Sequence, residues 1–355
     1  MKIYIKKNIL ESIVNLCSSC TDKEEYAVIN SHLLFEAKKN ELFIKANNLD
    51  MGLEYKIKEV KIENQGFATA NAKDFIDIIR NLDDDTIILE TIENSLFIKQ
   101  KSTKYKVPMF KDEEFPKFPS INNNEKFNID SNNLIRSLKK TLPAVDNNNM
   151  KPSLNGILID IKKDKINFVS SDTKRMALLQ INEAQEKEFS LIIPKKSIIE
   201  IEKIINNKVE IYYDENILII KNDDFYFFTK LINDKFPDYE RVIPKQKMNH
   251  NFRFKTDDFT KSLKKMSMMD KVELHINKNK IEFLGEDTDG KEAKTELETD
   301  LNIEEKLVLK FKIKYLLDFL NSIEDEEFEL QINEENMPFM VLSEELKTII
   351  MPTIL

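Results

Sequence analysis

The sequence predicts an α+β protein built from three similar domains, and three observations support this class. The chain has 355 residues, which is longer than one ordinary hydrophobic core requires. Two kinds of segment recur along it, with copies about one domain length apart. Each of these lengths contains segments with the apolar spacing of a helix and segments that alternate between apolar and polar residues, as strands do.

The first repeated segment reads as an amphipathic helix, a short polar turn and an alternating strand. It occurs at 71–90, 194–213 and 312–331, so successive copies start 123 and 118 residues apart. An acidic residue occupies the matching helical position in each copy, at Asp77, Glu200 and Asp318. Repeats of solenoid proteins are much shorter, so each copy indicates a separate domain.

The second repeated segment is a strand-like opening followed by a short helix with an apolar pair at positions i and i+4. The pairs are Leu10 and Val14, Leu134 and Leu138, and Phe259 and Leu263. A strand, an acidic turn and a second strand follow, at 43–51, 166–177 and 281–290. Polar, proline-bearing stretches at 118–125 and 243–250 predict the borders between domains 1–120, 121–245 and 246–355.

The composition predicts a protein of the reducing cytoplasm. Charged residues make up 33% of the chain, the mean hydropathy is -0.43, and no window approaches the roughly 18 apolar residues of a membrane span. Lys6 and Lys7 come too early for a signal peptide, and the chain has only two cysteines. The five glycines form none of the usual phosphate-binding loops, and the net charge of -9 disfavours bulk coating of DNA.

Basic residues nevertheless concentrate on the repeated helices. They are Arg136, Lys139 and Lys140 on one helix, Lys261, Lys264 and Lys265 on another, and Lys195 and Lys196 at the start of a third. The first two helices are expected to contain no acid. For any single helix, an ordinary solvated face is the simpler explanation. Recurrence at equivalent places favours a segregated positive surface that meets phosphates without reading bases.

The C-S-S-C segment at 17–20 has the spacing of a redox or zinc site, which the surrounding sequence disfavours. Cys17 continues the apolar stripe of Leu10 and Val14, so it is expected in the core, with Cys20 as a bystander. A zinc site lacks further ligands, because there is no second cysteine pair and there are only three histidines. Acidic runs at 83–85 and 324–327 fall in turns and lack the order of a calcium loop. No metal site, cofactor or catalytic constellation is predicted.

Two longer stretches and the C-terminus carry a family resemblance. They are S-S-D-T-K-R-M-A at 170–177, K-L-I-N-D-K-F-P-D-Y-E-R-V-I-P at 230–244, and the terminal M-P-T-I-L. With them the chain closely resembles the bacterial sliding clamps, the β subunits of DNA polymerase III, over its full length. The resemblance implies a processivity factor in DNA replication, without catalysis or cofactor, that encircles double-stranded DNA regardless of sequence.

The resemblance also implies an assembly and a set of partners. Clamps of this kind are head-to-tail homodimers whose six similar domains close a ring, with helices lining the hole and sheets outside. The basic helices would then face the DNA, and the dimer interface would join Tyr105 and Val107 to Met268 and Met269. The expected partners are the catalytic subunit of the replicative polymerase, the clamp loader and other proteins with a clamp-binding motif, and no membrane.

The apolar C-terminus, by the same resemblance, forms part of a pocket for partner peptides. Carried over by position, the pocket residues are Leu154, Ser171, Thr173, Lys174, Arg175, Met176, Pro237, Arg241, Val242, Pro338, Ile349, Met351, Pro352 and Thr353. Residues 348–351 are also expected to form the last strand. Thr173-Lys174 stands where the family often has Gly-His, and Ile354 where it often has Arg, so the preferred peptide is expected to differ.

Two other functions stay open as alternatives to the clamp. A redox or metal enzyme would depend on Cys17 and Cys20 for its activity. A scaffold unrelated to replication would not be retained on circular DNA.

Overall fold

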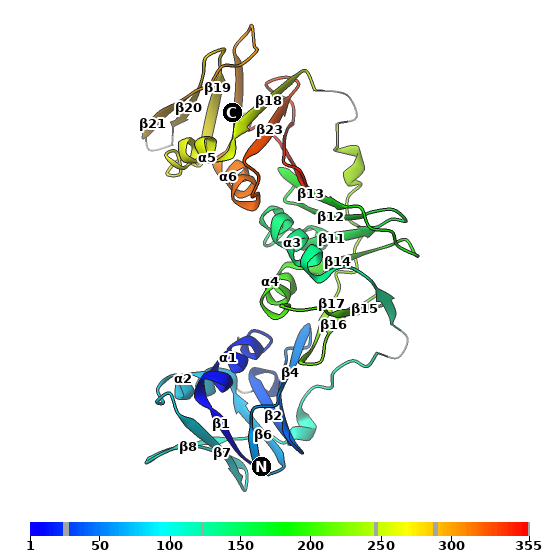
Figure 1. Ribbon diagram of the computed structural model, residues 1–355, viewed down its shortest axis with the longest axis vertical. Helices are drawn as coiled ribbons and strands as arrows, with labels where there is room; N and C mark the ends of the chain where they lie inside the picture. The colour runs from blue at the N-terminus through cyan, green and yellow to red at the C-terminus, as the bar shows by residue number, and fades with distance from the viewer. Residues whose placement is uncertain (24–27, 122–123, 245–247, 287–289, 354–355) are drawn as a thin grey trace. The chain divides into compact units, whose positions relative to one another are not determined.

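The computed structural model describes residues 1–23, 28–121, 124–244, 248–286 and 290–353. These residues form four antiparallel sheets and six α-helices, which belong to two compact units (Figure 1). One unit comprises Met1–Ser131 and Ile199–Leu231, and the other comprises Asn132–Ile198 and Ile232–Leu355. The predicted domain 121–245 therefore contributes to both units. The exact borders at 120 and 245 stay a prediction.

The first unit contains an eight-stranded and a five-stranded sheet. The order in the larger sheet is β10 (Glu125–Phe127), β15 (Glu210–Tyr213), β16 (Ile217–Lys221), β17 (Phe225–Lys230), β4 (Met51–Ile57), β3 (Glu41–Asn47), β2 (His32–Lys38) and β6 (Gly66–Asn71). The order in the smaller sheet is β5 (Lys61–Asn64), β1 (Lys2–Lys6), β7 (Thr86–Ile92), β8 (Ser95–Gln100) and β9 (Thr103–Pro108). Because β17 pairs with β4, one sheet continues across the predicted border between the first two domains.

Two helices pack together in the first unit, α1 (Lys7–Ser18) and α2 (Ala72–Arg80) (Figure 1). The predicted pair Leu10 and Val14 is fully buried where α1 meets β3 and β4. Asn71 caps α2, since its side-chain oxygen accepts hydrogen bonds from the N–H groups of Lys73 and Asp74. The cap and the apolar stripe explain why both segments are helical.

The second unit repeats this arrangement with an eight-stranded and a four-stranded sheet. The order in the larger sheet is β14 (Phe189–Pro194), β11 (Gly156–Ile161), β12 (Ile166–Ser171), β13 (Arg175–Ile181), β25 (Leu346–Ile350), β24 (Phe339–Leu342), β23 (Glu327–Ile332) and β18 (His250–Lys255). The order in the smaller sheet is β21 (Glu292–Glu298), β20 (Lys280–Glu286), β19 (Lys271–Ile276) and β22 (Leu307–Lys312). Here the pairing of β13 with β25 joins segments of the predicted second and third domains.

The remaining helices are α3 (Ser131–Thr141), α4 (Lys195–Ile204), α5 (Thr256–Lys264) and α6 (Ile313–Ser322). The expected helix–strand repeats are confirmed as α2 with β7, α4 with β15 and α6 with β23. The expectation of an acid-free helix near Phe259 is wrong, because α5 begins at Thr256 and includes Asp257 and Asp258 in its first turn. Acids at a helix N-terminus interact favourably with the helix dipole. No helix in the described ranges is both long and apolar enough to cross a membrane.

Candidate peptide-binding site

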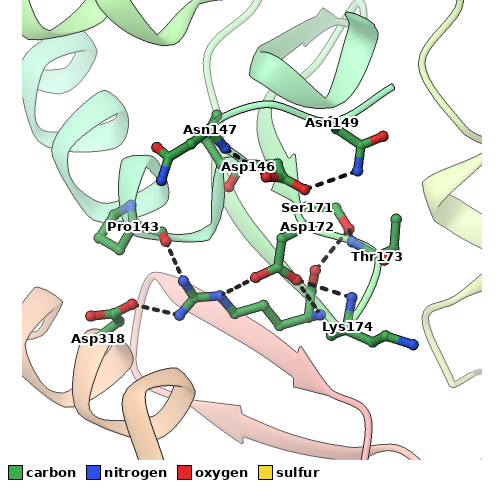
Figure 2. A network of polar contacts seen from close by, with 12 residues as sticks. Pro143, Asp146, Asn147, Asn149, Ser171, Asp172, Thr173, Lys174 and Asp318 are labelled. Carbon is green, nitrogen blue, oxygen red and sulfur yellow. Dashed lines mark hydrogen bonds and ion pairs between the residues drawn. The ribbon is translucent and has the colours of Figure 1, made fainter. Parts of the chain in front are cut away.

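A tight turn between β12 and β13 carries four of the expected pocket residues (Figure 2). Asp172 Oδ1 accepts hydrogen bonds from the backbone N–H of Lys174 at 3.0 Å and that of Arg175 at 2.9 Å. Ser171 Oγ donates to the carbonyl of Arg175 at 2.7 Å. These bonds hold Thr173 in a left-handed conformation with φ of 73°, which a β-branched residue rarely adopts. The turn is therefore strained, and its own side chains keep it in place.

The guanidinium of Arg175 joins this turn to α6. Its Nε lies 3.1 Å from Asp172 Oδ2, and its Nη1 lies 2.7 Å from Asp318 Oδ2. Its Nη2 donates to the carbonyl of Pro143, and the group stacks over the ring of Tyr315 at 4.6 Å. The side chain is only 4% exposed, and its charge is met by two carboxylates. Arg175 stays an expected pocket residue, and within the chain its charged group links the turn to α6.

The apolar C-terminal stretch forms the expected last strand, β25, between β13 and β24. Ile349 lies opposite Met176 on one side and opposite Met340 on the other. Beyond the strand, the N–H of Met351 donates to the carbonyl of Lys174 at 2.8 Å. The structure thus places the tail beside the turn that precedes β13.

Beneath the tail and this turn lies an apolar cluster of buried side chains. Its members are Leu154, Leu158, Val169, Met176, Leu178, Ile192, Phe236, Tyr239, Met248, Met340 and Ile349, with Ile232, Ile243 and Leu342 packed partly buried against them. Leu154, Met176 and Ile349 were expected in the pocket. Met340 and Leu342 were not, although the continuous apolar run F-M-V-L at 339–342 could have indicated a buried strand there.

A buried polar group anchors the F-P-D-Y stretch to this cluster. The hydroxyl of Tyr239 donates to Asp160 Oδ2 at 2.7 Å and accepts from the side-chain amide of Asn167 at 2.9 Å. Burial and the neighbouring carboxylate raise the pKa of Tyr239 above its ordinary value, so the hydroxyl stays protonated and can donate. Phe236 and Tyr239 then fix the segment that carries three expected pocket residues, which are Pro237, Arg241 and Val242.

The edge of the cluster presents apolar side chains to solvent. Val242 and Met351 are both exposed, although each is large and apolar. The side chain of Arg241 is 84% exposed and forms an ion pair with Asp238 at 2.7 Å. Pro237, Pro338, Pro352 and Thr353 are half-buried, while Thr173 and Lys174 are exposed. This arrangement offers an apolar floor, an exposed apolar rim and an exposed guanidinium to an extended peptide.

The basic residues expected to face DNA fall into two groups. Lys139, Lys196, Lys261, Lys264 and Lys265 are exposed. Arg136 and Lys140 instead both form ion pairs with the carboxylate of Glu345. Nη1 of Arg136 lies 2.8 Å from Oε1, and Nζ of Lys140 lies 2.9 Å from Oε2.

Lys195 also departs from the expectation of a free surface cation. Its ammonium donates to the carbonyl of Val145 at 3.1 Å and to Asn147 Oδ1 at 2.8 Å, so it ties α4 to the loop after α3. Burial lowers the pKa of Lys195 below its ordinary value, and the nearby charges of Lys314 and Arg175 act in the same direction.

The expected dimer residues lie in different surroundings. Tyr105 and Val107 belong to β9, an edge strand of the five-stranded sheet. Met268 is 81% exposed, but Met269 is only 5% exposed and packs against Gly285. The two methionines follow α5 in a turn and do not continue the helix. Met268 is therefore accessible to a partner chain, whereas Met269 belongs to the core of its own chain.

The two cysteines of the C-S-S-C segment lie in the protein core. Cys17 and Cys20 are both free and both buried, so Cys20 is a core residue too and not a bystander. Burial raises the pKa of Cys20 to about 12. Across the described part of the chain, no group of three or more potential metal ligands is found.

Comparison with known proteins covers the whole chain. The models of the N-terminal, central and C-terminal domains of the DNA polymerase III beta subunit match residues 1–119, 128–238 and 240–354. A beta sliding clamp of Helicobacter pylori strain 26695 is 34% identical over 372 aligned positions, which cover 99% of each chain.

Solved structures agree with these matches. The Helicobacter pylori beta clamp bound to a DNA ligase peptide is 33% identical, with a TM-score of 0.90 and complete coverage of both chains. The beta subunit of Thermotoga maritima is 23% identical with a TM-score of 0.89, covers 100% of this chain and 99% of its own, and shows the shared fold. The chain therefore belongs to the DNA polymerase III beta subunit family, the beta sliding clamps.

Proposed function

We propose that the chain is a DNA sliding clamp, which encircles duplex DNA and tethers partner proteins through a peptide-binding pocket. The family consists of processivity factors without catalysis. The main support for the proposal is the position of the C-terminal tail. The backbone N–H of Met351 donates to the carbonyl of Lys174 in the turn before β13, next to the apolar cluster. The similar Helicobacter pylori clamp has been solved with a DNA ligase peptide.

The pocket suits a short peptide with large apolar side chains. Burial of apolar surface contributes about 25 cal/mol per Å², so a Leu and a Phe side chain would supply most of the affinity. Met176 of β13 and Met351, which follows β25, would border the site, and methionine adapts to differently shaped side chains. Arg241, with its exposed guanidinium, is placed to contact the polar part of a peptide and fix its direction.

The ring is the second part of the proposal. Two chains would associate head to tail, so that helices line the hole and sheets form the outer wall. The unpaired edge of β9, with Tyr105 and Val107, and the exposed side chain of Met268 support these sites as the dimer interface. Met269 would support Met268 from the core rather than contact the partner.

The exposed lysines support the lining of the hole. Lys139, Lys196, Lys261, Lys264 and Lys265 would meet phosphates collectively, and each would contribute little. Weak, sequence-independent contacts suit a sliding protein, because strong base contacts would stop the motion. We infer that the cytoplasmic partners are the catalytic subunit of the replicative polymerase, the clamp loader and other proteins with a clamp-binding motif.

The deciding experiment measures retention on DNA. The protein, loaded by a clamp loader on a nicked circular duplex, should stay bound through gel filtration and leave when the circle is cut by a restriction enzyme. Covalently closed and linearised molecules of the same sequence provide the control. Equal retention on circle and linear DNA would mean ordinary binding rather than encirclement, and a scaffold unrelated to replication would be retained on neither.

A further inference from the structure

Glu345 sits in the turn between β24 and β25 and holds two cations of α3. Its Oε1 lies 2.8 Å from Nη1 of Arg136, and its Oε2 lies 2.9 Å from Nζ of Lys140. The turn itself is fixed, because the N–H of Leu346 donates to Ser343 Oγ and the N–H of Ser343 donates to the carbonyl of Leu346. One carboxylate thus bridges two positive charges from a well-defined position.

The two cations share one face of the helix. Arg136 and Lys140 are four residues apart and therefore lie above one another on α3, where both reach Glu345, whereas Lys139 is exposed. The side chain of Lys140 is only 12% exposed, so its ammonium is held at the carboxylate rather than in solvent. Two of the three cations of α3 consequently share one carboxylate, which balances one of their two positive charges within the chain.

A carboxylate in this position resembles a DNA phosphate, which is the group that α3 is proposed to contact. A phosphodiester and a carboxylate each present two oxygens that share one negative charge, and Arg and Lys bind both through charge-assisted hydrogen bonds. A phosphate can use Arg136 and Lys140 fully only when Glu345 releases them.

We propose that Glu345 is an internal competitor of the DNA backbone, which occupies Arg136 and Lys140 and keeps the contact between α3 and DNA weak. The inference rests on the proposed placement of α3 at the hole. It assigns Glu345 a role in setting how firmly the clamp holds the duplex, and it explains how a helix can be basic without becoming a tight DNA-binding element. Glu345 acts through the two cations and does not touch DNA itself.

The test compares two neighbouring acids of the same turn. Glu345→Gln removes the competing charge while keeping the shape of the side chain. Glu344→Gln removes the same charge from an exposed residue that makes no ion pair with α3 among the described contacts, so it is the matched control for long-range electrostatics. Binding of the intact dimer to a short linear fluorescent duplex is measured by anisotropy across a salt series.

Glu345→Gln should bind the duplex about fivefold more tightly at low salt, since two partly exposed ion pairs no longer have to be broken. The slope of log affinity against log salt should steepen by about one to two, one for each cation that newly engages a phosphate. Glu344→Gln should give a much smaller increase with an unchanged slope. Glu345→Asp, which keeps the charge on a shorter side chain, should lie between Glu345→Gln and the wild type.

Variants that lack the two cations distinguish a failure of this inference from a failure of the proposed function. In a protein that carries Arg136→Gln and Lys140→Gln, the effect of Glu345→Gln should shrink to that of Glu344→Gln. If the two acid variants bind equally well in the wild-type background while the cation variants weaken binding, α3 faces DNA but Glu345 is no competitor. If the cation variants leave binding unchanged even with Glu345→Gln, then α3 does not face the duplex and the proposed lining of the hole fails. Unchanged thermal unfolding and light scattering establish that each variant is a folded dimer.

Discussion

The backbone N–H of Met351 donates a hydrogen bond to the carbonyl of Lys174 at 2.8 Å, and this bond joins two segments 177 residues apart in the chain. The N–H of Thr353 makes a second bond of 2.8 Å, to the carbonyl of Lys310. A short tail that would otherwise fray is thereby pinned at two places. Some of its apolar residues are buried in the last strand, β25, and others lie in the exposed rim beyond that strand.

Replacing Met351 by Asp should weaken the binding of polymerase-type peptides by roughly tenfold or more, since it places a charge where a peptide would bury apolar surface. Deletion of residues 351–355 should abolish binding and leave the dimer intact. Peptide titration by calorimetry measures both, with light scattering for the oligomeric state. Met150→Asp is the control, because Met150 is an exposed methionine outside the expected pocket. Full-strength binding by the deletion variant would show that the tail is a core strand alone.

Replacing Arg175 by Ala should destabilise the protein by about 2–4 kcal/mol, because it removes the partner of two carboxylates from a mostly buried network. Arg175→Lys should recover little, because an ammonium cannot reach Asp172, Asp318 and the Pro143 carbonyl together. Chemical denaturation is the measurement. Arg241→Ala is the matched control, and it should leave stability unchanged while weakening peptide binding. The opposite pattern would show that Arg175 serves peptide binding more than stability.

Replacing Thr173 by Gly should stabilise the protein by roughly 1 kcal/mol, since glycine adopts the left-handed conformation without the clash of a β-branched side chain. Thr173→Ala keeps a Cβ and should recover much less. Denaturation of the two variants side by side measures the difference. Equal stabilities would mean that the hydrogen bonds of Ser171 and Asp172 already remove the strain.

Replacing Met268 by Glu should yield a folded monomer, because the exposed side chain is proposed to enter the dimer interface. Met269→Glu should instead lower the thermal unfolding temperature, since it buries a charge beside Gly285 in the chain's own core. Light scattering and thermal melts of the single variants distinguish these effects. A Met268→Glu protein that stays dimeric at low concentration would exclude this site from the interface.

Cys20 should resist alkylation in the native protein at pH 8, since burial raises its pKa from 9.0 to about 12 and leaves almost no thiolate. It should react readily after unfolding. The raised pKa adds stability that is fully present below about pH 9 and is lost as the pH rises toward 12, because the unfolded thiol then ionises and the folded one does not. Mass spectrometry after timed alkylation checks the first point. Rapid native labelling would reopen a redox function for the C-S-S-C segment.

Local patterns in the sequence were enough to predict the repeated units. The pairs Leu10 and Val14, Leu134 and Leu138, and Phe259 and Leu263 are buried as expected, because helical periodicity depends on neighbours only a few residues apart. The same holds for the final strand, where Ile349 and Ile350 are buried between two other strands, whereas Met351 lies beyond the strand and is exposed. The start of α5 was misplaced, because Asp257 and Asp258 are compatible with either a turn or a helix N-terminus.

Only the tertiary structure decided how these units join and which charges are free. The pairings of β17 with β4 and of β13 with β25 extend each large sheet across predicted domain borders. Glu345, which pairs with Arg136 and Lys140, and Asp318, which pairs with Arg175, lie 143 to 209 residues away from these cations, so no local pattern reveals them. Periodicity shows which side of an element is buried, but a long flexible side chain takes its partner from whatever the fold brings within reach. For that reason the sequence could predict that α3 is basic, but only the fold showed that Glu345 forms ion pairs with two of its three cations.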